Sequence, residues 1–479
     1  MNLSMGGGKS SSEKHRIQSS LLLRWFSSFS KTFSSMFSYD FCNKWRRDSM
    51  SRIRLMLTVL VSVVVLSFGS FVFADDVEQT KVLERRVLPL PFMNRGKMED
   101  AWLGYAISDS IHFKCNRATK DDTRVVFYDY EAVLRVLKDL LLLRSDLTDE
   151  KHIKKVSAHF GATLIITGEF SVNEGKVTIK IFAYGFSPKS GEAERLGEKS
   201  VEGKMDSLDD LLSSVAKEVL IFSGYTSPFT LKALPLSDER LYIEYAKVLY
   251  YKRDPDTYEK AMEILSKLHE KCKEAPVLYQ LGWLSTEKAL KTENESEMRT
   301  FRDVAKKFFN KAGETDSSFA RAFNSLGLIF LAEKNYANAE IQFVKAAKAD
   351  AKLPDAHYAL GNLYLEIRKY EKAVEPLKVA YSLKPGDAGI ANSLGCTYFE
   401  LEKLTEAEDW YKRALELDKN CLEAHQGLGL LYDEKGNKEK AAEHYGKYIE
   451  LGGDDEDIKA RLIQLRLELL KGEGKEKEK

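Results

Sequence analysis

The sequence of 479 residues lacks the usual signatures of catalytic and metal-binding sites. Its eight histidines include no HExxH motif and no pair at metal-ligand spacing, and no GxSxG segment marks a nucleophile. Its five cysteines form no CxxC pair. Lys+Arg and Asp+Glu both number 73, so the overall charge shows no basic bias for nucleic acid. These absences argue against an enzyme and predict no cofactor, no metal and no nucleic-acid partner.

One apolar run stands out near the N-terminus. Residues 50–74, MSRIRLMLTVLVSVVVLSFGSFVFA, place two arginines before the run and DDVE follows it. This layout predicts a bacterial signal peptide, with an uncleaved anchor helix of about 20 apolar residues, centred on residues 55–73, as the alternative. Either one places the remainder in the periplasm or at the cell envelope. Residues 1–49 are then an upstream extension before a start at Met50, or a cytoplasmic tail before an anchor.

A 34-residue repeat dominates the C-terminal half of the chain. The stretch NSLGLIFLAEKNYANAEIQFVKAA, residues 324–347, has three further copies downstream. Small and bulky positions keep the same spacing in all four copies: Gly327, Gly361, Gly395 and Gly429; Ala339, Ala373, Ala407 and Ala441; Phe343, Leu377, Tyr411 and Tyr445. A fixed period of this length is typical of stacked helix–turn–helix repeats. We expect the small residues to let the two helices approach, and the bulky residues to fill the gap between neighbouring repeats.

Two less regular copies precede these four. Gly282 is followed by Ala305 at a spacing of 23 rather than 12, so an insertion of 11 residues lengthens the helices or their turn. Ala246 takes the place of the glycine in the first copy, with Ala261 downstream. The whole pattern resembles the tetratricopeptide repeat family, which implies an all-α solenoid of about six repeats over residues 238–453. Residues 454–479 are predicted to form a polar capping helix and a charged tail.

Residues 81–223 have a different pattern, with strands and helices in the order β-α-β-α-α-β-β-β-α. The last strands include a hairpin around residues 173–175, and Val177, Ile179, Ile181 and Ala183 alternate towards the interior. One helix is expected to begin at the N-cap Thr148 and to end at Gly161. The prediction is an α+β chain: a mixed-sheet α/β domain, a linker over residues 224–237, and the repeats.

The α/β region also resembles a family of envelope domains. The segments VLPLPFMNRG, AWLGYAISDSI, FGATLIITGEF and VEGKMDSLDDLL are similar in order and pattern to the amino-terminal domain of TolB and to its curli-assembly and flagellar outer-membrane relatives. This resemblance implies an assembly or accessory role in the cell envelope.

The register of the repeats predicts a partner-binding groove on the first helices. Its candidate residues stand three residues before and one, four and five residues after the glycines: Asn324, Tyr358, Asn362, Leu365, Glu366, Asn392, Phe399, Glu400, Gln426 and Glu434. Amides suit the backbone of an extended peptide, apolar residues add contact area, and glutamates favour a basic segment. The alternative is that these side chains simply solvate a helix face. Chaperone-binding members of the family use a lysine at the first of these positions to hold a terminal carboxylate, and this sequence has none there.

Two functional hypotheses follow. The first is a non-enzymatic interaction scaffold in the bacterial envelope, which binds a partner peptide or helix in the groove and associates with the membrane through residues 55–73 if these are not cleaved. The second is an accessory or regulatory subunit whose α/β domain binds a small molecule or carbohydrate for an envelope enzyme.

Overall fold

The computed structural model describes residues 85–477, apart from positions 123, 143–145, 189, 226, 232–233 and 253–256, and side chains as far as Leu470. All of these residues belong to one structural unit that begins at Lys81. The predicted extension and the predicted signal or anchor segment lie outside the described residues. Within the described part, no helix combines the length and the apolarity needed to cross a membrane.

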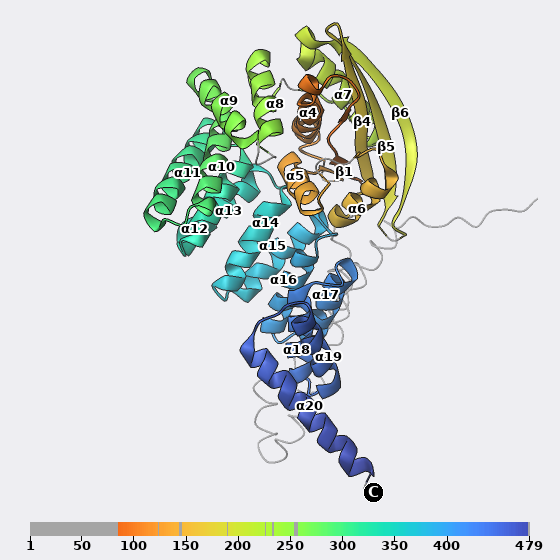
Figure 1. The fold of residues 1–479 in the computed structure, drawn as a ribbon, viewed down its shortest axis with the longest axis vertical. Helices are drawn as coiled ribbons and strands as arrows, with labels where there is room; N and C mark the ends of the chain where they lie inside the picture. The colour runs from red at the N-terminus through yellow and green to blue at the C-terminus, as the bar shows by residue number, and fades with distance from the viewer. Residues whose placement is uncertain are drawn as a thin grey trace, which may run out of the picture. The chain divides into compact units, whose positions relative to one another are not determined.

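A mixed sheet with packed helices forms the N-terminal part of this unit, as the predicted α+β class requires (Figure 1). In chain order its elements are β1 (Arg85–Pro89), β2 (Met93–Asn94), η1 (Met98–Asp100), α4 (Leu103–Ala118), β3 (Val125–Phe127), α5 (Tyr130–Asp139), α6 (Glu150–Phe160), β4 (Leu164–Asn173), β5 (Lys176–Ser187), β6 (Glu192–Lys204), η2 (Met205–Ser207) and α7 (Leu208–Phe222). The short elements β2, η1 and η2 were not predicted.

The strands lie in the order β3-β1-β4-β5-β6, and β2 pairs with β4 beside this path. Strand β1 is parallel to β3 and β4, whereas β4, β5 and β6 are antiparallel. On β5, Val177, Ile179, Ile181 and Ala183 are fully buried, because alternate side chains of a strand point to one face. The predicted hairpin and its inward alternation are confirmed.

Helices α4 and α7 pack against each other, and α7 lies across β6 (Figure 1). The sheet admits α7 closely because Gly203 faces Leu211 and Gly197 faces Phe222. The predicted end of α6 at Gly161 is confirmed by its left-handed backbone, with φ 62°. The predicted N-cap was wrong by one residue.

Asp149, not Thr148, caps α6, and its carboxylate accepts a hydrogen bond from the Lys151 N–H at 2.8 Å. Thr148 instead donates its hydroxyl hydrogen bond to Asp146 at 2.6 Å. Both residue types suit a cap, so the sequence did not distinguish between these neighbours.

Thirteen helices follow in the described part of the chain. They are α8 (Glu239–Tyr251), α9 (Tyr258–Lys271), α10 (Ala275–Lys291), α11 (Glu295–Thr315), α12 (Ala320–Ala332), α13 (Tyr336–Ala349), α14 (Pro354–Glu366), α15 (Tyr370–Leu383), α16 (Ala388–Glu400), α17 (Leu404–Leu417), α18 (Leu422–Glu434), α19 (Lys438–Glu450) and α20 (Glu456–Lys477). The predicted insertion lengthens both helices of its pair: α10 and α11 have 17 and 21 residues, against 13 and 14 in α12 and α13.

The periodic small residues lie where helices meet. Ala339, Ala373, Ala407 and Ala441 are fully buried. A Cβ added to Gly327 would lie 2.5 Å from the Phe343 ring of the same repeat, and one added to Gly361 would lie 2.5 Å from Leu377. The bulky residue therefore packs first on the glycine of its own repeat, so the expectation that it fills the gap between repeats was incomplete. Tyr411 does both, because its ring also faces Gly427 of the next repeat.

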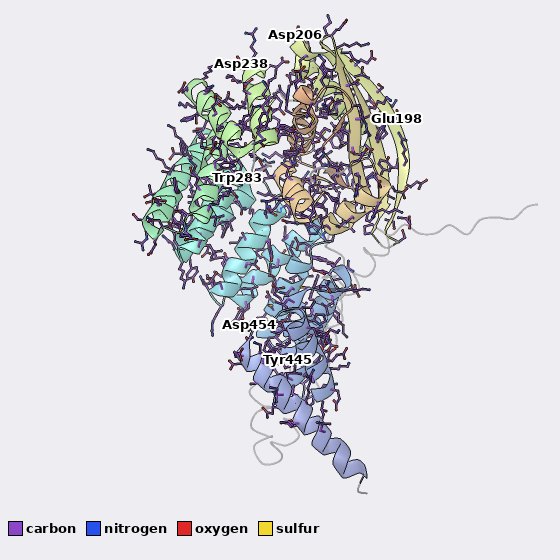
Figure 2. All side chains as sticks on the ribbon, viewed as in Figure 1. Glu198, Asp206, Asp238, Trp283, Tyr445 and Asp454 are labelled. Atoms are coloured by element: carbon purple, nitrogen blue, oxygen red, sulfur yellow. The ribbon has the colours of Figure 1, made fainter. Side chains whose placement is uncertain are left out.

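The last helix, α20, packs on α19 and closes the stack. Ile458, Leu462 and Leu465 are buried against the last repeat, beside Tyr445 (labelled in Figure 2). Its outer face is less polar than predicted, because Ile463, Leu467 and Leu470 are each more than half exposed.

Candidate functional site

The candidate site is one face of the first helices of the repeats. With about 100° of rotation per residue, positions six and three residues before a repeat glycine, and one, four and five after it, fall within an arc of about 100°. We call the surface made by these positions on α10, α12, α14, α16 and α18 the ladder face. It contains all ten predicted groove residues.

Helix α5 of the α/β region lies on the first part of the ladder face. Asp129, the N-cap of α5, forms an ion pair with Arg321, which stands six residues before Gly327. One repeat further on, Arg135 donates a hydrogen bond to Asp355 at 3.1 Å. The ladder face of α12 and α14 is thus engaged at its N-terminal end by the chain itself.

The contact continues on the earlier repeats through Glu131. Its carboxylate accepts hydrogen bonds from Lys252 at the end of α8, at 2.5 Å, and from Gln280 on α10, at 3.1 Å. The Lys252 ammonium also lies 4.7 Å from the ring centre of Trp283, which Figure 2 labels. Lys252 and Gln280 thus hold Glu131, near the start of α5, against two repeats.

The turns between repeats complete the junction. Lys352 donates hydrogen bonds to the carbonyls of Thr119, Asp122 and Val125, at 2.5, 2.7 and 2.9 Å. It therefore holds the loop between the C-terminal end of α4 and β3. Burial lowers the pKa of Lys352 to about 8. The Tyr128 hydroxyl lies 2.6 Å from the Phe160 carbonyl and 3.1 Å from the Leu383 carbonyl.

The backbones of the α/β region and the repeats also approach each other closely at the junction. A Cβ added to Gly386, in the turn after α15, would lie 2.5 Å from the Gly161 nitrogen, so a side chain there would separate the two parts. No pattern in the sequence predicted this junction. Its partners are more than 200 residues apart in several cases and follow no periodic pattern.

Charges are concentrated where α5 meets the repeats. Burial raises the pKa of Asp129, but the charge of Arg321 and a hydrogen bond from the Ala132 N–H more than offset it, so the group stays ionised. Burial likewise raises the pKa of Glu131, and Lys252 and Arg321 more than offset it. For Asp109 on α4, burial outweighs the opposing charge of Arg321 and raises the pKa to about 7.

The predicted groove residues differ in exposure along the ladder face. Asn324 is nine-tenths buried, with a relative exposure of 9%. Half-buried positions follow on α14, α16 and α18: Tyr358, Asn362, Leu365, Asn392, Phe399 and Gln426. Glu366, Glu400 and Glu434 are exposed. The structure therefore brings the predicted residues onto one face, on which Asn324 of α12 is more buried than the predicted residues of α14, α16 and α18.

Three carboxamides on this face have an unsatisfied acceptor. The Oδ1 atoms of Asn324, Asn362 and Asn392 are buried without a hydrogen-bond partner. Leaving a buried carboxamide oxygen without a hydrogen bond costs roughly 1–3 kcal/mol, so a ligand that donates hydrogen bonds to these amides, once they have reoriented, recovers that free energy on binding.

Some of the glutamates are already used within the stack. Tyr336 donates a hydrogen bond to Glu366 at 2.9 Å, and a hydrogen bond to Glu400 raises the pKa of Tyr370. Asp433 accepts two hydrogen bonds from Arg461 of α20, at 2.7 and 2.6 Å. Leu328 and Leu430, one residue after their glycines, are 47% and 42% exposed.

The described residues offer no obvious metal centre. No group of three His, Cys, Asp or Glu side chains within them could hold a metal ion.

The paired helices and their glycine–bulky register define a chain that carries tetratricopeptide repeats, a fold that typically serves as a non-catalytic scaffold for protein interaction. Comparison with family models agrees. The model described as TPR repeat matches residues 395–436, and tetratricopeptide repeat matches residues 422–452. A third model, anaphase-promoting complex, cyclosome, subunit 3, matches residues 332–414.

Several solved structures are similar over part of the chain. YrrB, described as a TPR protein with an unusual peptide-binding site, is 25% identical, with 43% of this chain and 97% of YrrB covered and a TM-score of 0.34. PilF of Pseudomonas aeruginosa is 18% identical over 48% and 98% of the two chains, with a TM-score of 0.40. MamA of Desulfovibrio magneticus RS-1 is 24% identical over 36% and 94%, with a TM-score of 0.32.

The repeat register and the family models define the class of the chain. No curated protein matches the chain.

Proposed function

We propose that this protein is a non-enzymatic scaffold that holds a partner protein on the later part of the ladder face, by which we mean the ladder positions of α14 from Tyr358 onwards and those of α16 and α18. We further propose that the partner contributes an extended, basic segment and that the complex forms at the bacterial cell envelope.

The observation that carries this proposal is the unequal state of the ladder face. Its first part is engaged by α5, through the Arg321–Asp129 and Arg135–Asp355 pairs. Its later part presents half-buried amides and apolar side chains that have the chemistry of a peptide groove. In stacked repeats this concave surface is the one that binds partners.

The side chains of the later part suggest the partner's chemistry. Asn362 and Asn392 have buried, unsatisfied carboxamide oxygens, which suit the N–H groups of an extended backbone. Phe399 and Leu430 offer apolar contact. Glu434 and Glu400 are exposed carboxylates at the edge, which favour lysine or arginine in the partner.

The envelope location rests on two sequence features. The run at residues 50–74 has the layout of an export signal or anchor, and the α/β region resembles envelope domains of the TolB type. A fusion of residues 1–80 to a reporter that is active only after export tests it: an inactive reporter would refute the location and leave the groove hypothesis standing.

The groove is tested by a double substitution, Asn392→Ala with Phe399→Ala. Isolation of the tagged full chain from cross-linked cells should lose its main partner, because the double substitution removes one amide and one aromatic contact, together about 2–4 kcal/mol. This corresponds to at least a thirtyfold loss of affinity.

The matched control changes an asparagine and an exposed apolar residue on a second helix, Asn338→Ala with Ile341→Ala on α13. Ile341 is 50% exposed and Asn338 is exposed. This variant should keep the partner. Equal recovery of the partner by both variants would rule out the groove.

A further inference from the structure

A cavity of about 540 Å³ opens where α4, the start of α5 and the turns before α12 and α14 meet. Its volume falls in the range of small-molecule sites, about 300–1,000 Å³, and is far larger than a single ion needs. The cavity belongs to the junction of the α/β region with the repeats and is distinct from the later part of the ladder face. The proposed function does not use it.

Three hydrogen-bond acceptors of α4 line this cavity at helical spacing. Asp109, His112 and Asn116 stand at i, i+3 and i+7, so they share one face of the helix. We call them the acceptor stripe. They lie beside Asp129, whose carboxylate is 3.7 Å from the Nε2 atom of His112.

Each member of the stripe presents an acceptor. His112 approaches the Tyr128 carbonyl through Nδ1 at 3.1 Å, and burial lowers its pKa, so the ring is neutral with the proton on Nδ1 and a lone pair on Nε2. Asn116 donates through Nδ2 to Asp350 at 3.3 Å, and its buried Oδ1 has no partner. Asp109 is nine-tenths buried and accepts a hydrogen bond from Tyr242 at 3.3 Å.

Within the part of the chain that the structure describes, one buried carboxylate of the stripe has no ion-pair partner. Three carboxylates interact with one another here, those of Asp109, Asp129 and Glu131. Arg321 forms an ion pair with Asp129, and Lys252 forms one with Glu131. Among the described residues, no cation forms an ion pair with the buried Asp109. An uncompensated buried carboxylate is strongly unfavourable, and a bound cation relieves it.

We propose that this cavity binds a small ligand that carries a primary amine or guanidinium group, with that group held by the acceptor stripe and by Asp129. Such a group supplies a positive charge beside Asp109 and several N–H donors, which suit acceptors spread along two turns of a helix better than a single metal ion does. Phe113, Tyr245 and Phe319 provide apolar walls for the carbon chain of the ligand.

The rim indicates where the other end of the ligand lies. Lys120 and Lys348 line the cavity and are exposed. A free amine would leave them solvated, whereas an amino acid would place its carboxylate between them. Both sources share the cationic group that the stripe recognises.

Calorimetric titration of the full chain with agmatine, L-arginine and glutarate tests the proposal. Agmatine and arginine should bind and glutarate should not. Asp109→Asn should weaken the binding of both cations at least tenfold, because it removes the unmatched charge. Asn116→Leu, which removes an acceptor but no charge, should weaken it about fivefold, and the exposed control Asp210→Asn should change nothing.

The relative strength of two probes identifies the source. Tighter binding of arginine than of agmatine supports an amino acid held at the rim, and the reverse supports a free amine. If neither cation saturates the site at concentrations up to about 10 mM, its dissociation constant is too high for a specific site, and the proposal is overturned. Unchanged affinity in both Asp109→Asn and Asn116→Leu, or equal binding of glutarate, would also overturn it.

Discussion

Replacing Gly395 with alanine should destabilise the repeats, although alanine normally favours a helix. A Cβ at this position would lie 2.5, 2.7 and 2.9 Å from three ring carbons of Tyr411. The ring has no room to retreat, because Tyr411 is 2% exposed and its far edge already faces Gly427. Overpacking of this kind costs about 1–3 kcal/mol, and the better helix propensity of alanine returns up to about 1 kcal/mol. Because the ring cannot move away, the cost lies in the upper part of this range, about 2–3 kcal/mol, and the expected net loss is about 1–2 kcal/mol.

Gly446 provides the matched control, because it lies within helix α19 and an added Cβ there meets its nearest atom, of Arg466, at an ordinary 3.4 Å. Gly446→Ala should stabilise by about 0.5–1 kcal/mol, since only the propensity changes. Urea unfolding followed by far-ultraviolet circular dichroism measures both variants. The two substitutions are chemically identical, so opposite signs would isolate the close helix contact.

A Gly395→Ala variant as stable as the wild type would contradict this account of the repeat packing. A second substitution sharpens the test. Combining Gly395→Ala with Tyr411→Leu, the residue type found at the equivalent position 377, should cost less than the sum of the two single changes.

Two further predictions concern the junction. Asp109→Asn should change how stability depends on pH: burial raises the pKa of Asp109 from 3.8 to about 7, so the wild-type fold binds this proton more tightly than the unfolded chain and loses stability as pH rises between these values. In urea unfolding, the free energy of unfolding of the Asn variant relative to that of the wild type should therefore rise by up to about 4 kcal/mol between pH 4 and pH 7.5. A difference between the two proteins that does not change with pH would refute this assignment. Arg321→Met should destabilise the junction by about 3–5 kcal/mol and make it sensitive to limited proteolysis, because the buried Asp129 carboxylate loses its ion-pair partner. The control Arg299→Met changes a side chain that is 74% exposed and should alter stability by less than about 0.5 kcal/mol. Equal proteolysis of the two variants would contradict the role of the Arg321–Asp129 pair.

The local packing rules were visible in the sequence. The spacing of Gly361 and Ala373 predicted paired helices, because only small residues allow that approach. The displaced Ala305 predicted longer helices or a longer turn, and the structure shows longer helices. The alternation of Ile179 and Ile181 predicted a strand with one buried face. The helix signals follow, or depart from, the 34-residue period of the repeat, and the strand signal follows the two-residue period of a strand, so a single sequence reveals them.

The junction was not visible in the same way. Asp129 and Arg321 are 192 positions apart, and each resembles an ordinary surface charge at a helix start. The acceptor stripe at Asp109, His112 and Asn116 does have helical spacing, but polar residues at this spacing usually face solvent. Burial by a distant part of the chain gives them their significance, and no local pattern encodes that burial.

Photo-cross-linking at Leu430 tests the central claim most directly, with Ile341 as the comparison position on a second helix. A photoreactive residue at either position is exposed, and the cross-linked peptide is identified by mass spectrometry. We predict that position 430 captures one defined, lysine- or arginine-containing segment of a partner protein in living cells and that position 341 does not. No cross-linked product at 430, or the same product at both positions, would contradict the claim that the ladder face of the later repeats binds the partner.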